Sequence, residues 1–375
     1  MRGEVPSQPN FVSLINVETM IAADHPIRSI KRMCDEVLRE MSGHFDEIYA
    51  AKGAPSIPPE TLLKAKVLQA LYTVRSDRQL CARMQTDLMF RWFVDLPLDE
   101  AVFDASTFSK NQQRLLAHEV ADLFFSEVVE LARRHGWVSD DHFSVDGTLI
   151  EAWASVKSFQ PKGTDQGPGS GNGWTDFKGQ KRSNDTHAST TDPEAKLVRK
   201  GDGKEARLCF GGHATMENRQ GLCVLFEVKP AVGAPESAVA VEQMTELHNR
   251  GFTPQTVGAD KGYHTREFVA GLREQGIVPH CARKERQKTL HVLLTLAHAI
   301  SQKLRKRIEE IFGWAKTTGD FRKSRYRGIE RTHAQGQYVV APGTSCAWPS
   351  CWSPRHRTWR GRNARGGRSV PAHCE

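Results

Sequence analysis

The sequence predicts an α/β protein in which an all-helical N-terminal domain precedes a mixed α/β domain. Residues from about 14 to 135 keep apolar side chains at helical spacing. Residues from 142 to about 282 instead alternate short β-forming runs with helical runs. We therefore expect a helical domain at residues 1–138 and a mixed domain at residues 139–338.

The helical domain starts with one well-defined apolar stripe. Its members are Ile27, Ile30, Met33, Cys34, Val37, Leu38 and Met41. Further helices are expected from Pro59, from Ser76, a residue type that caps helix starts, and near Ser106. Short helices in series fit either a DNA-binding helix-turn-helix region or a plain helical bundle, and both interpretations remain open.

The mixed domain alternates strands and helices. The predicted strands are residues 143–150, 207–215, 222–228, 256–259 and 277–281, and the predicted helices are residues 236–249 and 265–275. A basic helix follows at residues 301–316, with one apolar stripe. This order places the strand at residues 143–150, the strand at residues 256–259 and the helix at residues 301–316 in one domain.

A polar stretch interrupts the mixed domain between residues 156 and 203. It is rich in Gly, Ser, Thr, Asp and Lys, and this composition cannot bury enough apolar surface to offset chain entropy. We predict a flexible surface insertion. It either connects two strands, the favoured interpretation, or orders on DNA with Trp174 stacked on an unpaired base.

Three acidic residues lie at the ends of predicted elements or within the basic helix. Asp146 and Asp260 each follow a β-forming run that a glycine soon ends, and Glu309 lies on the helix face that carries Arg305 and Lys316. The ordinary alternatives are a turn-forming Asp before Gly and a solvated Glu in a helix. Glu310 competes with Glu309, but it projects about 100° away.

Carboxylates from separate elements are the oxygen ligands that Mg²⁺ prefers, and Mn²⁺ can substitute for it. Two such ions can activate the attacking oxygen and stabilise the leaving oxygen of a phosphodiester. Asp146, Asp260 and Glu309 therefore predict a two-metal phosphoryl-transfer site. Arg305, Lys316 and Lys261 are the candidate phosphate-binding residues, although Lys261 taken alone is at least as well explained as a solvated cation.

The charge balance favours an anionic partner. The net charge is +8 over 375 residues, and residues 283–331 hold 14 Lys and Arg against 5 Asp and Glu, a net +9. Neutralising phosphates with such cations gives salt-dependent binding to nucleic acid.

We find no apolar run of about 18 residues and no leader pattern, so we expect a cytoplasmic protein without a membrane segment. The eight cysteines lack paired metal-binding spacing, which favours buried free thiols.

Three motifs in order resemble the DDE transposases of bacterial insertion sequences, in the fifth insertion-sequence family and its close relatives. They are Val145-Asp146-Gly147-Thr148, Asp260-Lys261-Gly262-Tyr263, and the Arg-x3-Glu-x6-Lys pattern of Arg305, Glu309 and Lys316. The resemblance runs from about residue 14 to 338. One position departs from the family: Gln302 stands where a tyrosine is usual.

The resemblance implies an RNase H-like catalytic domain whose acids Asp146, Asp260 and Glu309 hold Mg²⁺. It also implies binding to the terminal inverted repeats of an element and to target DNA, metal-dependent cleavage and strand transfer, and a homodimer on double-stranded DNA. The expected location is the bacterial cytoplasm, at the nucleoid. A related alternative is a metallonuclease that cuts DNA without joining it.

The last segment, residues 339–375, has a different character. It holds three tryptophans and many Arg and Gly, with no helical or strand period. A shifted reading of one possible coding sequence for residues 343–352 gives an amphipathic helix, so we interpret the segment as a disordered, basic, frameshift-derived tail. The alternative function that follows is an inactive or repressor-like transposase remnant that binds DNA without catalysis.

Overall fold

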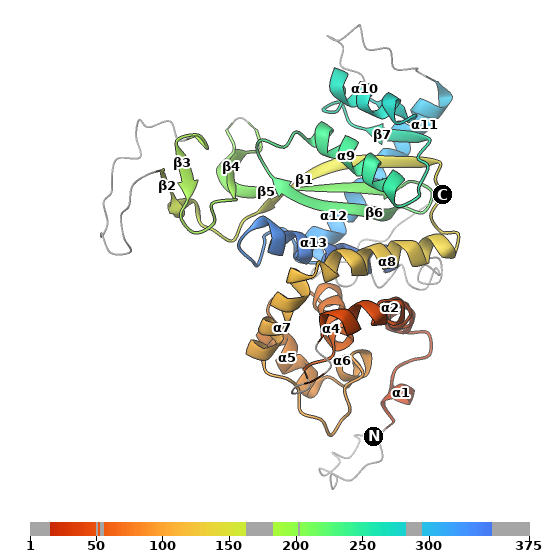
Figure 1. Ribbon diagram of the computed structural model, residues 1–375, viewed down its shortest axis with the longest axis vertical. Coiled ribbons are helices and arrows are strands. Elements are labelled where there is room, and N and C mark those ends of the chain that lie inside the picture. The colour runs from red at the N-terminus through yellow and green to blue at the C-terminus, as the bar shows by residue number, and fades with distance from the viewer. Residues whose placement is uncertain are drawn as a thin grey trace, which may run out of the picture.

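The computed structural model describes residues 16–49, 52, 56–162, 183–201, 203–282 and 295–346. A helical part containing the N-terminal elements lies against an α/β part, and helices α8 and α13 run between them (Figure 1). The helices of the first part are α1 (Val17–Met20), α2 (Ile27–Glu40), α3 (Ser42–Ile48), α4 (Pro59–Leu71), α5 (Asp77–Thr86), α6 (Leu88–Phe93), α7 (Ala105–Ala117) and α8 (Val120–Arg134).

The predicted signals of the helical part are largely confirmed. Helix α2 buries the predicted stripe from Ile27 to Leu38, α4 begins at Pro59, and the Ser76 hydroxyl accepts a hydrogen bond from the Gln79 amide at 3.2 Å. Arg91 is buried and donates to the carbonyl of Met84 at 3.2 Å. This arginine therefore holds the fold together and is neither solvated nor available to DNA.

The second part contains a six-stranded sheet in the order β4-β5-β1-β7-β8, with β6 paired to β5. Its strands are β1 (His142–Glu151), β4 (Lys196–Arg199), β5 (Ala206–Glu217), β6 (Leu222–Pro230), β7 (Thr256–Ala259) and β8 (Val278–Cys281). Strand β1 is antiparallel to β5 and parallel to β7, and β7 is parallel to β8. The sheet has the mixed α/β, RNase H-like order that the sequence predicts.

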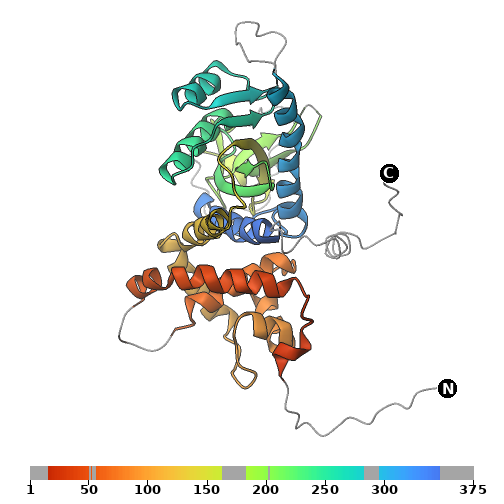
Figure 2. The same ribbon diagram turned by 90° about the vertical axis from the view of Figure 1, so that its right-hand side faces the viewer.

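Helices cover both faces of this sheet. Helices α9 (Glu236–Asn249) and α10 (Arg266–Glu274) lie on one side, and α11 (Leu296–Leu304) and α12 (Ile308–Thr317) lie on the other (Figure 2). The core between the layers is apolar, with Phe143, Val257 and Phe252 buried. Within the described residues, no helix combines the length and apolar character needed to cross a bilayer.

The basic helix predicted at residues 301–316 is interrupted. A short 3₁₀ segment, η2 (Arg305–Arg307), separates α11 from α12. The tighter turn brings Arg307 to the turn between β5 and β6, where it donates to the carbonyls of Asn218 at 3.0 Å and Gln220 at 3.1 Å. The interruption of the helical pattern thus coincides with a tertiary contact.

The prediction of a flexible insertion at about 156–203 is wrong for the residues that the structure describes there. They form η1 (Val156–Ser158), the paired strands β2 (Phe159–Pro161) and β3 (His187–Ser189), and β4 at the edge of the main sheet. Apolar burial of Phe159 and Ala195 and hydrogen bonds to the start of α13 both hold this segment. Buried Asp192 accepts from the Gly328 amide at 3.0 Å, and Glu194 accepts from the Ile329 amide at 2.9 Å. Trp174 lies outside the described residues.

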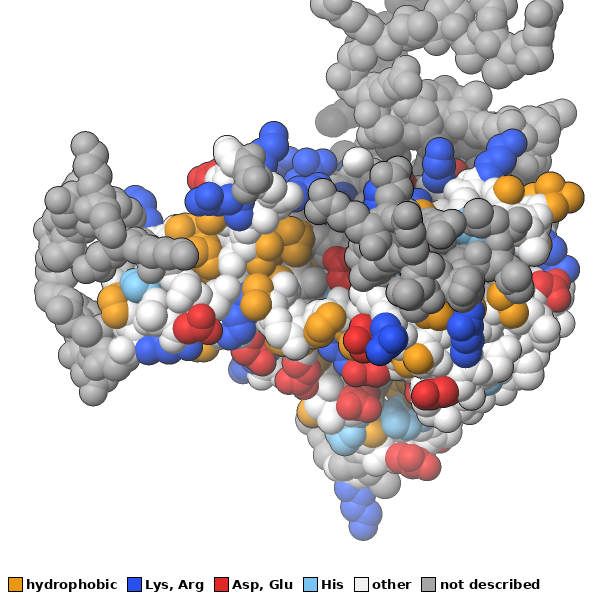
Figure 3. Space-filling model, turned by 90° about the horizontal axis from the view of Figure 1, so that it is seen from above, with side chains coloured by type: hydrophobic (Ala, Val, Ile, Leu, Met, Phe, Trp, Pro, Cys, Tyr) orange, Lys and Arg blue, Asp and Glu red, His pale blue; other side chains and the backbone are white. Residues whose placement is uncertain are grey.

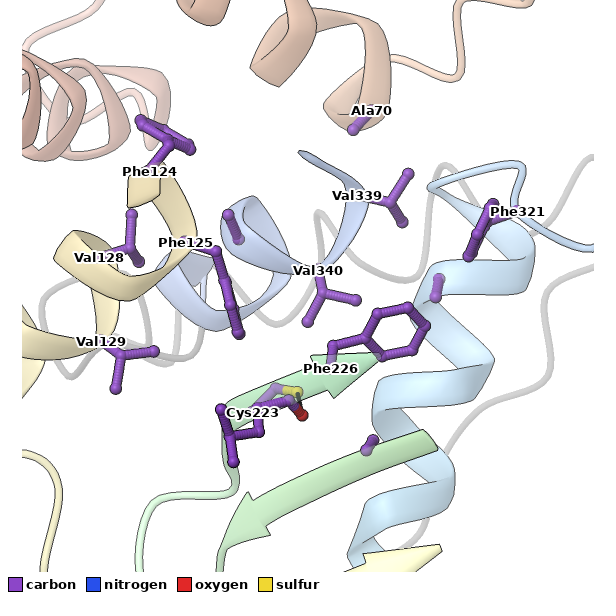
Figure 4. Packing of buried hydrophobic residues seen from close by; sticks show 14 of the residues in the cluster. Ala70, Phe124, Phe125, Val128, Val129, Cys223, Phe226, Phe321, Val339 and Val340 are labelled. Atoms are coloured by element: carbon purple, nitrogen blue, oxygen red, sulfur yellow. Dashed lines mark hydrogen bonds between the residues drawn. The ribbon is translucent and has the colours of Figure 1, made fainter. Parts of the chain in front are cut away.

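The prediction of disorder from residue 339 is also wrong for residues 339–346. They continue α13 (Ile329–Cys346), and Val339, Val340 and Ala341 are buried. Figure 4 shows Val340 facing Phe226 of β6 and Phe125 of α8. Packing of this kind outweighs the low helix propensity of a Pro-Gly sequence. Residues 347–375 of the predicted tail lie outside the described residues.

Five of the eight cysteines are shown to be free and buried, as predicted: Cys34, Cys81, Cys209, Cys223 and Cys281. Burial raises the pKa of the Cys209 thiol to about 11. The Cys209 thiol is therefore protonated at neutral pH and behaves as a small apolar side chain.

Candidate active site

The pairing register of the central strands brings the two predicted aspartates to the same place. The parallel pairing of β1 with β7 ends at Ser144 opposite Gly258. Asp146 and Asp260 each follow that last pair by two residues. They therefore occupy equivalent positions just beyond the paired part of β1 and β7. Their side chains lie on the same face of the sheet, because side chains alternate along a strand.

Asp146 does not end its strand, contrary to the interpretation of the glycine after it, whereas the predicted strand at residues 143–150 is confirmed. It lies in the middle of β1, opposite Ala214 of β5. Strand β1 continues to Glu151 because it pairs with β5 as far as that residue, whereas its pairing with β7 ends at Ser144. The glycine that follows Asp146 is therefore a strand residue and not a turn residue.

The charge of Asp146 interacts with the other two predicted acids. Asp146 is half-buried, and its Oδ1 accepts a hydrogen bond from the Gly147 amide at 2.9 Å. Burial is the main cause that raises the pKa of Asp146, and the carboxylates of Asp260 and Glu309 raise it further. The nearby Arg305 and the Gly147 amide act in the opposite direction on this pKa.

Asp260 also shapes the turn that follows β7. Its Oδ1 accepts hydrogen bonds from the amides of Gly262 at 2.6 Å and Tyr263 at 3.3 Å. The turn-forming role common to Asp before Gly is thus present here. The same carboxylate lies close enough to Asp146 to raise its pKa, so a structural role and a place among the acids coexist in one residue.

Glu309 and Arg305 come from adjacent segments, α12 and η2. Glu309 is exposed in the first turn of α12. Arg305 is half-buried, and its Nε is buried without a hydrogen-bond partner among the described residues. The competing Glu310 instead lines a small cavity with Trp314 and Gln220. The charge of Glu309 is among those that raise the pKa of Asp146, so Glu309 stays the candidate acid here.

The three predicted phosphate-binding cations have different surroundings. Lys316 donates a hydrogen bond to the hydroxyl of Thr148 on β1, two residues beyond Asp146. Burial and the neighbouring Lys200 and Arg322 lower the pKa of Lys316. Lys261 is exposed and forms no hydrogen bond or ion pair with the three acids in the described part of the chain. The structure thus brings the charge of Arg305 close to Asp146 and holds Lys316 on Thr148, in the same strand as Asp146. It shows no such contact for Lys261.

A fourth carboxylate, which the sequence reasoning missed, lies beside these acids. Glu236 is the first residue of α9. Burial is the largest cause that raises the pKa of Glu236, and the charges of Asp146 and Asp260 raise it further. The only sequence signal is Pro235 before the helix start, which marks a helix boundary but not proximity to Asp146.

The chemistry of these side chains fits a divalent cation. Hard carboxylate oxygens come here from a strand, a turn and a helix. The charges of Asp260 and Glu309 add to the burial that raises the pKa of Asp146, and a bound cation would relieve that repulsion. No three carboxylate, imidazole or thiol groups among the described residues already surround one point.

Two family models match the chain. Transposase domain (DUF772) matches residues 15–114, and Transposase DDE domain matches residues 139–340. No curated protein matches significantly.

Two solved structures illustrate more distant likenesses. One is a piggyBac transposase synaptic complex with hairpin DNA, 7% identical, with 92% of this chain and 78% of that chain covered at a TM-score of 0.39. Another is a Mos1 transposase paired-end complex with left transposon end, 10% identical, with 88% and 85% covered at a TM-score of 0.20. Likenesses this remote carry no argument about function. The DDE family model, in contrast, covers more than half of the 375 residues, and the chain therefore belongs to the DDE transposase family.

Proposed function

We propose that this transposase cuts and joins DNA at a divalent-metal site held by Asp146, Asp260 and Glu309. The observation that supports this proposal most is the shared register step of Asp146 and Asp260, with Glu309 acting on the same carboxylate. Bound Mg²⁺, or Mn²⁺ in its place, would polarise the phosphodiester and lower the pKa of an attacking water or hydroxyl.

The surrounding residues suit a phosphate group. Arg305, whose charge acts on Asp146, has a buried Nε–H that no other described residue bonds. Lys316 is held by Thr148 on the face of β1 that carries Asp146. Lys261 lies next to Asp260 in sequence and is exposed, so it would meet DNA without prior positioning. These cations neutralise charge that develops on the phosphate oxygens.

The surface around the site supports a DNA partner. Lys and Arg side chains gather along one edge of the catalytic half, and Asp and Glu gather mostly along the opposite edge (Figure 3). The basic edge lies on the side of α11 and α12 (Figures 2 and 3), and exposed Lys303 and Lys306 belong to α11 and η2. We propose that this side binds the terminal inverted repeats and the target DNA, with the transposase acting as a homodimer.

For the organisation of the chain, we propose a helical domain at residues 1–138 and a catalytic domain from residue 139. The catalytic domain would include α13 to Cys346, beyond the boundary at residue 338 that the sequence predicts. The helical domain would assist DNA binding, as a bundle or as a helix-turn-helix region.

The test uses purified full-length protein, DNA carrying the element's ends, and Mg²⁺ or Mn²⁺. We expect cleavage and strand transfer, abolished by EDTA and by Asp146→Asn, Asp260→Asn or Glu309→Gln, with Glu310→Gln as the matched control that stays active. Undiminished cleavage in the Asp variants would contradict the assignment. Cleavage without strand transfer on a pre-cut end would identify a metallonuclease. End binding without cleavage would identify the repressor-like remnant.

A further inference from the structure

Gln302 joins the end of the strand before Asp260 to the helix before Glu309. It lies in the last turn of α11 and is half-buried. Its side-chain Nε2 donates to the carbonyl of Ala259 at 3.2 Å and also to the carbonyl of His280. Ala259 is the last residue of β7 and directly precedes Asp260. The amide therefore reaches the backbone at the point where the second acid leaves the sheet.

Two further contacts fix α11 to the same strand ends. The His298 Nε2 lies 3.0 Å from the carbonyl oxygen of Cys281, the last residue of β8. Ser301 packs so closely on β7 that a β-carbon at Gly258 would be 2.9 Å from its Oγ. Of these three residues, Gln302 is the nearest in sequence to Glu309. It is also the one that contacts the residue directly before Asp260.

The chain continues from Gln302 to Glu309 without a loop. Arg305 at the end of α11 has helical backbone angles, and η2 leads directly into α12. Glu309 follows Gln302 by seven residues, which is about 10 Å along helical backbone. A displacement of α11 on the strand ends would therefore move Glu309 and Arg305 relative to Asp260.

An amide suits this position for a chemical reason. The NH₂ group of glutamine has two donors, and here it faces two backbone carbonyls. A tyrosine hydroxyl has only one proton to donate, so the residue usual in the family could not make both bonds. The departure at position 302 thus coincides with a paired acceptor site at the ends of β7 and β8.

We propose that Gln302 is a positioning residue that fixes the distance between Asp260 and the Arg305–Glu309 segment. The proposal rests on the proposed function for its catalytic consequence. Residues that orient metal-binding side chains through a second hydrogen bond commonly alter metal affinity or activity by about 10- to 100-fold when replaced. We expect an effect of that size here, on the chemical step and on metal dependence rather than on DNA affinity.

The experiment compares Gln302→Met, which keeps length but donates nothing, with Gln302→Glu, which places an acceptor against two carbonyls. The matched control is Gln275→Met, since Gln275 Nε2 also makes two hydrogen bonds, to Val241 and Thr245, away from the acids. We expect cleavage at saturating end DNA to fall about 10- to 100-fold in Gln302→Met and further in Gln302→Glu. The Mn²⁺ concentration for half-maximal rate should rise, and the Kd for DNA should stay within about twofold. Gln275→Met should match the unmodified protein.

Hydrogen exchange provides a readout that does not depend on activity. Gln302→Met should speed exchange in residues 256–262, and Gln275→Met should not. Unchanged cleavage and exchange in Gln302→Met would overturn the proposal. A loss confined to DNA affinity would also overturn it and would make Gln302 a DNA contact. If the unmodified protein proves inactive, the proposed function fails, and the exchange result alone upholds or overturns the positioning role.

Discussion

The backbone of Gly147 lies directly against the carboxylate of Glu236. A β-carbon added at Gly147 would be 2.6 Å from Glu236 Oε1 and 2.7 Å from its Cδ. A side chain larger than hydrogen at this position would therefore require the Glu236 side chain to move. The start of α9 thus limits the space beside the residue that follows Asp146.

The first prediction follows from this contact. Gly147→Ala should lower the free energy of unfolding by about 1–3 kcal/mol, because the new methyl group displaces Glu236 or bends β1. Adding Glu236→Ala opens the space, so the double variant should lose less than the sum of the single variants. Urea unfolding measures both. Gly43→Ala, where nothing lies within 4 Å, is the control and should stay within about 0.5 kcal/mol.

The second prediction concerns the charge of Asp146. Its pKa is raised in the folded protein, first by burial and then by Asp260 and Glu309. The ionised form therefore costs stability, and this cost is absent below the unfolded pKa and grows as pH rises through the folded pKa. Metal-free Asp146→Asn should melt at a higher temperature than the unmodified protein at pH 7.5, although it is inactive.

Two comparisons check this interpretation by thermal unfolding. The difference in melting temperature should shrink as pH falls below the usual range for Asp, because both proteins then carry an uncharged group. Addition of Mn²⁺ should stabilise the unmodified protein and leave Asp146→Asn nearly unaffected. A variant that is less stable than the unmodified protein at every pH would contradict the raised pKa.

The third prediction concerns Lys316. If it contacts a DNA phosphate, Lys316→Met should weaken binding to all DNA sequences and reduce the slope of log K against log salt by about one. Lys229→Met is the control, because Lys229 lies between Glu227 and Glu242 on the acidic side. Fluorescence anisotropy at several salt concentrations measures the slope. An unchanged slope in Lys316→Met would restrict this lysine to its bond with Thr148.

The fourth prediction separates the described end of α13 from the residues beyond it. Truncation after Tyr338 removes buried Val339 and Val340 and should destabilise the protein by about 3–6 kcal/mol, at 1.5–3 kcal/mol for each side chain. Truncation after Cys346 keeps both and should leave the melting temperature nearly unchanged. Equal stability of the two truncated proteins would show that the last turns of α13 contribute nothing. The frameshift itself stays a prediction, and the coding DNA would test it.

Regular local patterns were sufficient to predict much of the fold. Strand β7 and helix α9 have the predicted bounds, because a β-branched run and an amphipathic run each agree with their packing. The break at η2 depends on Arg307 reaching carbonyls about 90 residues earlier in the chain, and no local window contains that contact.

The candidate site shows the same division. Short motifs identify Asp146, Asp260 and Glu309. Only the register of β1 and β7 shows that the two aspartates occupy equivalent positions beyond the last paired residues. Glu236 has no motif and reaches the site through the path of α9. The ordered parts of the insertion depend on Asp192 and Glu194, whose partners at the start of α13 lie about 135 residues away.

The position of α13 has a consequence for synthesis. It is the last of the described elements to be made, yet it covers β6 in one half of the molecule and α4 and α8 in the other. A nascent chain that stops short of Cys346 therefore holds apolar surface from both halves open to water. We expect the two halves to complete folding together after translation of α13, and incomplete chains to be prone to aggregation in the meantime.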